Sequence, residues 1–213
     1  MLESCKYEGT KWTKAHLERL QKLEIEKADR ETLDEYLQTY NYLCDRLEAM
    51  DKRIAEISAS EPYVEQANKL QCFIGVKELT AMKCITETGD FNRFKTAGAY
   101  AGDAGLGPGE HSSGESLYRT GITKAGSGVL RTALVEAAES ICRGRVGQKS
   151  KDLKRRQAKC NSETVAYADK ANERLRRKYY KMIRKGKPRN VAIAAVAREL
   201  ACFVWGMMTD CTG

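Results

Sequence analysis

The chain has 213 residues, a formal net charge of +8 at pH 7, 42% hydrophobic residues and 31% charged residues. This composition is that of a soluble globular protein with room for one ordinary domain and a helical extension. No run of about 18 uninterrupted apolar residues occurs, because Arg198 and Glu199 interrupt the most apolar stretch, residues 191–208. We therefore expect no membrane span. Only three prolines and 8% aromatic residues favour helix over sheet.

The eight cysteines and two histidines are not clustered in the way that a zinc site needs. No CxxC pair occurs, and His16 and His111 are the only histidines. We therefore expect no metal site in this chain. The cysteines are interpreted as reduced, mostly buried thiols of a cytoplasmic protein.

Residues 12–57 are predicted to be helical, with a break near Asp29. Apolar side chains then recur at alternating spacings of three and four, at positions 33, 36, 40, 43, 47, 50, 54 and 57. This is an a/d seam sustained for nearly four heptads. An antiparallel helical pair and a coiled coil between chains both satisfy such a seam. We predict that the chain self-associates through it into a homo-oligomer.

A boundary is expected at Pro62 and the polar residues 58–61 before it. The sequence thus predicts a helical, coiled-coil region at residues 1–66 and a second domain at residues 67–213. The start of the second domain, residues 70–94, resembles one helix-hairpin-helix, in which backbone N–H groups at Gly75 would meet a DNA phosphate. A plain helical turn is the alternative. Further helices are expected at residues 129–142, 162–184 and 190–208.

Residues 98–128 hold more than half of the chain's 17 glycines. We expect an irregular loop on a helical scaffold, a common setting for functional residues. Nucleotide-binding phosphate loops are excluded, because neither GxxxxGK[ST] nor GxGxxG occurs.

Within this segment the adjacent Ser112 and Ser113 precede Gly114. A serine hydroxyl can attack a phosphodiester when a base takes its proton and cations stabilise the charge that develops. His111 is a candidate base. The candidate cations are Arg119, Lys124 and Arg131. The alternative is that both serines only satisfy backbone groups of a turn.

The positive charge is concentrated between Arg143 and Asn190, where 18 Lys/Arg stand against 4 Asp/Glu. The local balance is +14, so the rest of the chain is near −6. Such asymmetry is typical of proteins that bind polyanions, although a solvated helical face is the common alternative. We predict that this basic helical tail, residues 143–213, binds DNA or structured RNA, with Arg155, Arg156 and Lys159 among its contacts.

Several motifs together resemble the conserved block of the IS-one-ten insertion-sequence transposases, relatives of the Piv and MooV DNA invertases. They are GLGPGEHSSGE from residue 105, GITKAGSGVLRTALVEAA from residue 121, TGDFNRF before them and NVAIAAVARELACFVWGMM at the end. WTKAHLERL and the LDEYL-type heptads also resemble the family's central helical region. The stretch AYAGDAGLGP is longer and richer in glycine than the family's usual YLGL before the proline.

The resemblance implies a specific chemistry. Complete members carry an amino-terminal, Holliday-junction-resolvase-like domain with an acidic quartet that binds Mg²⁺, a coiled coil, and a carboxy-terminal domain with a nucleophilic serine. A structured guide RNA pairs with target and donor DNA. The serine of the family's SG pair corresponds to Ser113, which would form a covalent phosphoserine link to DNA. The acidic domain has no counterpart here, so we expect a truncated form that is inactive alone and holds no cofactor itself.

The sequence therefore predicts a mainly α protein, with a helical coiled-coil segment followed by a compact, mostly helical domain that carries a glycine-rich catalytic loop. The leading function is DNA transposition or site-specific recombination. The alternatives are a basic, dimeric fragment that binds DNA or RNA without cutting it, and a purely structural coiled-coil protein. The clustered glycines disfavour the last, because a coiled coil has no use for them.

Overall fold

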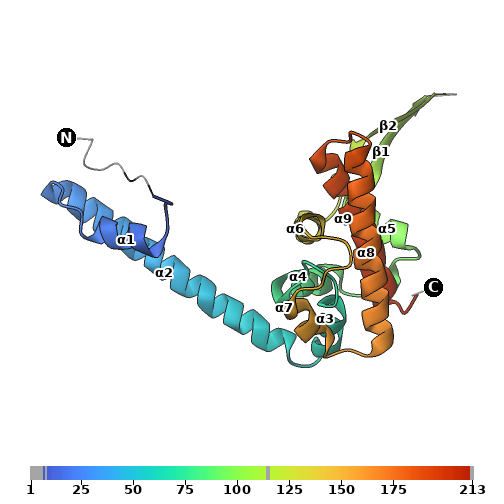
Figure 1. The fold of residues 1–213 in the computed structure, drawn as a ribbon, viewed down its shortest axis with the longest axis horizontal. Helices are drawn as coiled ribbons and strands as arrows, with labels where there is room; N and C mark the ends of the chain where they lie inside the picture. Colours follow the sequence, from blue (N-terminus) through green and yellow to red (C-terminus); the bar gives the residue numbers. More distant parts are fainter. Residues whose placement is uncertain (1–6, 8, 114–115, 212–213) are drawn as a thin grey trace. The chain divides into compact units, whose positions relative to one another are not determined.

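The computed structural model describes residue 7, residues 9–113 and residues 116–211, and for residues 110–120 it describes no side chains. Within this part of the chain, nine α-helices and one two-stranded sheet are formed (Figure 1). The prediction of a mainly α fold is confirmed. The chain has two compact units, Met1–Lys52 and Arg53–Gly213.

The first unit contains α1 (Lys14–Gln21) and most of α2 (Lys27–Ser58). Thr13 caps α1, because its side-chain oxygen accepts a hydrogen bond from the backbone N–H of His16 at 3.3 Å. Arg30 of α2 donates to the carbonyl of Leu20 at 3.0 Å, and so satisfies an acceptor that the end of α1 leaves open. The interruption predicted near Asp29 lies slightly earlier, between Gln21 and Lys27.

The predicted a/d seam runs along α2, and within the first unit most of it is open to solvent. Its large apolar side chains are exposed to the extent of 72% for Tyr36, 54% for Leu43, 62% for Leu47 and 50% for Met50. Leu37, which lies outside the seam, is by contrast 8% exposed. Among the described residues of its own unit, the seam therefore has no partner over most of its length.

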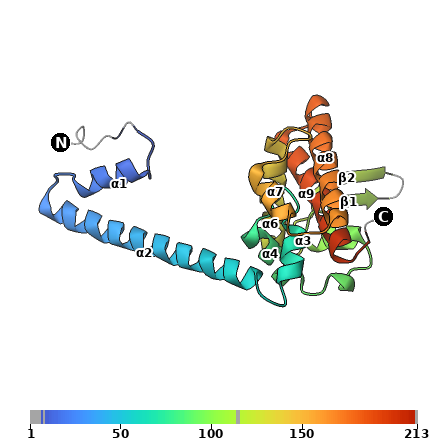
Figure 2. The same ribbon diagram turned by 60° about the horizontal axis from the view of Figure 1, so that its bottom comes forward.

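The second unit contains the remaining elements, which Figure 2 shows from a second direction. Its helices and strands are α3 (Val64–Leu70), α4 (Glu78–Thr88), the 3-10 turn η1 (Phe91–Arg93), α5 (Ala97–Asp103), β1 (Pro108–Ser113), β2 (Ser116–Ile122), α6 (Gly128–Arg143), α7 (Lys151–Gln157), α8 (Ser162–Arg184) and α9 (Arg189–Met208).

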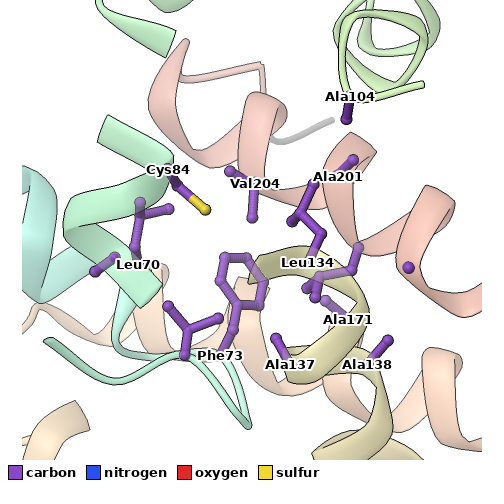
Figure 3. Packing of buried hydrophobic residues seen from close by; sticks show 14 of the residues in the cluster. Leu70, Phe73, Cys84, Ala104, Leu134, Ala137, Ala138, Ala171, Ala201 and Val204 are labelled. Atoms are coloured by element: carbon purple, nitrogen blue, oxygen red, sulfur yellow. The ribbon is translucent and has the colours of Figure 1, made fainter. Parts of the chain in front are cut away.

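Helix α9 is at the centre of the second unit, where it packs against α3, α5, α6 and α8. Its contact with α6 depends on small side chains, because buried alanines on both helices let the two backbones approach closely. Phe73, from the turn after α3, and Leu134 of α6 belong to the same buried cluster (Figure 3). The alanines of the two helices that belong to this buried cluster are Ala137 and Ala138 of α6 and Ala197 and Ala201 of α9.

By length and composition, α9 is the only helix among the described residues that could cross a membrane. Half of its apolar window is buried inside the protein. Its apolar character is therefore accounted for by its place in the core, where Val196, Leu200 and Val204 are completely buried.

The prediction of an irregular loop at residues 98–128 is wrong, because this segment contains helix α5 and a β-hairpin. Thr96 caps α5 by accepting a hydrogen bond from the N–H of Ala99 at 3.1 Å, and Tyr100 anchors the helix in the core. Strands β1 and β2 pair antiparallel, from Pro108 opposite Ile122 to Ser113 opposite Ser116. Both views show the hairpin standing out from the helices (Figures 1 and 2).

The turn at Gly75 is a packing turn, which decides between the two interpretations of residues 70–94. A Cβ atom on Gly75 would lie 2.5 Å from the carbonyl oxygen of Ala137 on α6. The neighbouring N–H of Ile74 donates to Oδ1 of Asn172 at 3.0 Å. These groups are directed into the protein, so the turn is the plain helical one.

Candidate nucleic-acid interface

The two candidate serines lie on strand β1, at the end of the hairpin that is farther from the helices. In the strand register Ser112 is opposite Leu117, and Ser113 is opposite Ser116. Arg119 is on the other strand, opposite Glu110. The side chains of these residues and of His111 lie outside the described part of the structure, as does Gly114 altogether. The backbone therefore places Ser113 and Arg119 on one hairpin, and the roles predicted for them remain predictions.

The base of the hairpin is fixed by backbone hydrogen bonds between the segment before β1 and the segment after β2. The N–H of Thr123 donates to Gly107 at 2.9 Å, and the N–H of Ser127 donates to Asp103 at 2.9 Å. Gly126 adopts a φ of +99°, and a Cβ atom there would collide with the carbonyl of Asp103. Only glycine lets the two segments come this close.

Arg131 completes this base. Its Nη1 donates to the carbonyl oxygen of Ala104 at 3.2 Å and to that of Lys124 at 3.1 Å. One half-buried guanidinium thus ties the residues before β1 to those after β2. The sequence suggested that Arg131 neutralises charge on a phosphate, but in this structure its Nη1 is engaged with the protein backbone. Lys124, in contrast, is exposed.

A groove of about 640 Å³ lies between the base of the hairpin and the amino-terminal half of α9. Its wall on the hairpin side includes Pro108 and Ile122, the first residue of β1 and the last of β2. Most of the lining is apolar, and three cations, Lys124, Lys178 and Arg198, also contribute. The remaining lining residues are Leu106, Gly121, Asn190, Val191, Ala194 and Ala195.

Glu199 joins α8 to α9 beside this groove. Its carboxylate accepts hydrogen bonds from Lys178, at 2.6 Å, and from Arg174. Burial raises the pKa of Glu199, but the hydrogen bonds from Lys178 and Arg174 together with the positive charges of these two residues outweigh it, and the pKa is lowered. The carboxylate also compensates the charge of Lys178, so Lys124 and Arg198 are the lining cations without an ion pair among the described residues.

Two arginines of the basic segment are buried and serve the fold. Arg156 is 7% exposed and donates to the carbonyl oxygens of Gln71 and Val76. Arg176 is also 7% exposed and donates to Ile141 at 3.0 Å, and burial lowers its pKa. The prediction that Arg156 contacts nucleic acid is therefore wrong, because its guanidinium is enclosed among carbonyls of the turn after α3.

Other cations of the segment are exposed, and many have no ion pair among the described residues. Arg155 pairs with Asp152 at 2.6 Å, while Lys159 is exposed and makes no such pair. A further cluster lies at the end of α8 and in the turn that leads to α9, next to the groove residue Asn190. The cluster, hereafter the α8–α9 cations, consists of Lys181, Arg184, Lys185 and Lys187. The sequence shows the high density of positive charge in these residues, but it does not show that they lie beside the groove.

Cys72 and Cys84 are buried thiols of low reactivity. No group of three His, Cys, Asp or Glu side chains that could hold a metal ion occurs in the described part of the chain. Burial raises the pKa of the Cys84 thiol to about 12, and it is the main cause that raises the pKa of Cys72 to about 12. Because the thiolate is the reactive form, these thiols are poor nucleophiles.

Part of the helical domain, including its projecting hairpin, matches a family model of transposases. Residues 67–155 match the model of the Transposase IS116/IS110/IS902 family. This chain therefore carries a domain of the IS116/IS110/IS902 family of transposases, and the resemblance identified from the sequence is confirmed.

Several curated transposases are similar in sequence. The transposase y4qE of Sinorhizobium fredii is 36% identical over 142 residues, which are 66% of this chain and 36% of that protein. The transposase for IS1533 of Leptospira borgpetersenii is 39% identical over 92 residues, 43% of this chain and 25% of its own. The transposase for IS1111A of Coxiella burnetii is 32% identical over 104 residues, 49% of this chain and 29% of its own. The chain spans about a third of the length of these relatives or less.

The position of Arg131 predicts a structural cost for its replacement. Arg131→Gln should lower the free energy of unfolding by about 2–3 kcal/mol, because two carbonyls lose a charged donor. Arg131→Lys should restore only part of the loss, since an ammonium lacks the planar fork of the guanidinium. Urea denaturation followed by circular dichroism measures both. The control Arg155→Gln removes an exposed arginine and should cost less than about 1 kcal/mol. An Arg131→Gln variant as stable as the parent would show that the two hydrogen bonds do not hold the hairpin.

Proposed function

We propose that this chain supplies the serine nucleophile of a DNA transposase, and that Ser113 is that nucleophile. The observation that carries the proposal is the position of Ser113 on strand β1, in a hairpin whose base is braced by Gly126 and Arg131. A braced base supports catalysis, because a nucleophile must be held in a fixed geometry relative to the bond that it attacks. The family match supports DNA as the substrate.

The proposed reaction exchanges one phosphodiester bond for another. The Ser113 hydroxyl loses its proton to a base and its oxygen bonds to the phosphorus, while the bond from phosphorus to one bridging DNA oxygen breaks. That oxygen takes up a proton and leaves as a hydroxyl. A DNA hydroxyl then loses its proton and its oxygen bonds to the phosphorus of the phosphoserine, while the bond from phosphorus to the serine oxygen breaks and that oxygen takes up a proton. Because the phosphoserine link conserves the phosphodiester, rejoining requires no nucleotide triphosphate.

The resemblance assigns two further components to the complete recombinase. One is an acidic, Mg²⁺-binding domain, and the other is a structured guide RNA that pairs with the DNA. Lys124 follows β2 at the base of the hairpin, away from Ser113, so Arg119 on β2 is our candidate for neutralising charge on the phosphorane. The second candidate function is binding of nucleic acid without cleavage, which the basic segment alone would support.

Covalent capture of DNA separates the two functions. In a complete recombinase, with the acidic domain and its cognate RNA present, Ser113→Ala should abolish the protein–DNA adduct, since no oxygen remains to bond to phosphorus. Ser112→Ala is the matched control and should retain some adduct. A denaturing gel of labelled DNA, with and without protease, detects the link. The 213-residue chain alone should form little or none.

Two results would contradict the assignment. An adduct that survives in Ser113→Ala would exclude this residue as the nucleophile. An adduct lost only in Ser112→Ala would assign the chemistry to the other serine of the pair. If the complete recombinase binds DNA and never forms an adduct, the non-cleaving function is the correct one.

The exposed α8–α9 cations predict salt-dependent binding of nucleic acid. Replacing all four with Gln should reduce the slope of log K against log salt by about 3–4, if each contacts one phosphate of the duplex. The loss should be alike for unrelated sequences, because phosphate contacts carry no base information. Fluorescence anisotropy with labelled duplexes measures the slope.

The first unit offers a charge-matched control for that experiment. Replacing four exposed lysines there with Gln removes the same net charge and should change the slope little. These lysines are Lys11, Lys14, Lys22 and Lys27. Equal losses in both variants would mean that net charge, and not the α8–α9 cations, determines the affinity.

We also propose that the chain self-associates through the open seam of α2. Four large apolar side chains exposed to at least half of their area support this, because a coiled-coil partner would bury them. Leu43→Asp should shift the mass measured by light scattering toward the monomer. Tyr42→Asp is the control, since Tyr42 is also exposed but lies outside the seam. A parent chain that is already monomeric at high micromolar concentration would overturn the proposal.

A further inference from the structure

We propose that the groove between the base of the hairpin and α9 binds one unpaired nucleotide of the DNA strand on which the serine acts. This inference rests on the proposed function, and it adds a second contact between the domain and the DNA strand. The groove is distinct from the serines, which lie at the other end of the hairpin.

The chemistry of the groove fits a nucleotide. Its floor is apolar, with Leu106, Ile122 and Val191 among the residues that would cover the faces of a base. Its volume of about 640 Å³ is within the range of about 300–1,000 Å³ that is usual for small-ligand sites. The space is large enough for a base together with its sugar, and the described lining contains no carboxylate that would repel a phosphate.

The cations that line the groove favour a nucleotide over an apolar helix as the molecule that binds there. Lys124 and Arg198 line the groove, are exposed, and have no ion pair among the described residues. A purely apolar partner would cover both cations without compensating them, which is costly. A nucleotide presents an apolar face and a phosphate together, so it can occupy the floor and pair with the cations at once.

The length of the hairpin places the groove close to the DNA strand on which Ser113 would act. Pro108 lines the groove, and Ser113 is five residues farther along β1. Five strand residues span about 17 Å, which corresponds to about five stacked nucleotides of one DNA strand. The groove is therefore within reach of the strand that contains the attacked phosphodiester. An unpaired nucleotide enters at the smallest cost, because it has already lost its pairing and stacking.

Binding by the 213-residue chain tests the inference without any need for catalysis. Two duplexes of the same sequence would be compared, one fully paired and one with a single unpaired 2-aminopurine. We expect the second to bind at least about tenfold more tightly, since the base need not be unstacked first. Emission from 2-aminopurine should change on binding as the base enters the apolar groove.

Two substitutions locate the effect. Val191→Glu places a negative charge at the groove and should reduce the preference for the unpaired duplex to near one. Arg198→Gln should reduce it severalfold through loss of one cation, and it provides a second variant if Val191→Glu fails to fold. Leu79→Glu is the control, because Leu79 is similarly exposed, at 42% against 51% for Val191, and is on α4, away from the groove. This variant should keep the full preference.

Every other result would contradict the inference, and each would lead to a different conclusion. Equal affinity for the two duplexes would show that the groove is not a site for an unpaired nucleotide, and it would leave the proposed DNA-binding function unaffected. No binding of either duplex contradicts both. A preference that persists in both groove variants places the unpaired nucleotide elsewhere. An RNA strand of the same sequence that competes as well as the DNA strand excludes the assignment to DNA, and a change of molecular mass in Val191→Glu identifies a second copy as the occupant.

Discussion

The close contact between α6 and α9 sets the geometry of the second unit. Buried alanines on both helices, such as Ala137 and Ala201, allow the backbones to approach more closely than larger side chains would. Helix α9 also packs on α3, α5 and α8, so the positions of these helices follow from its own. Because α5 leads into β1 and α6 follows β2, both ends of the hairpin are attached to elements of this core.

The hairpin depends on that attachment. Two strands alone are marginally stable in water, so the direction in which β1 and β2 project is determined at their base. There Gly126 permits a close approach of backbones and Arg131 supplies donors to two carbonyls. The base of the hairpin thus has a fixed position on the helical core, and Ser113 lies on the strand that projects from it. This is the arrangement that a domain needs if it is to hold a DNA strand and attack it at one place.

Some cations of this protein stabilise the fold, and others are exposed at its surface without an ion pair in the described segment. Arg156 and Arg176 are buried, and their planar guanidinium groups each satisfy backbone carbonyls from distant segments. Seven more cations between Arg143 and Asn190 are in ion pairs with carboxylates. The local charge of +14 therefore overstates the surface that is open to phosphate. The cations that remain unpaired in the described segment include all four at the end of α8, next to the groove.

The sequence by itself determined the helical class, the seam of α2 and the family motif, because each depends on the spacing of nearby residues or on a contiguous string of residues. It did not determine the hairpin, since clustered glycines indicate a loop until pairing across the turn makes β1 and β2. It also misassigned Arg156, whose charge suggested phosphate but whose partners are carbonyls, and it did not indicate that Arg131 ties the two segments at the base of the hairpin. Only the tertiary structure decided these roles, because burial and the approach of segments up to 85 residues apart are not encoded in local pattern.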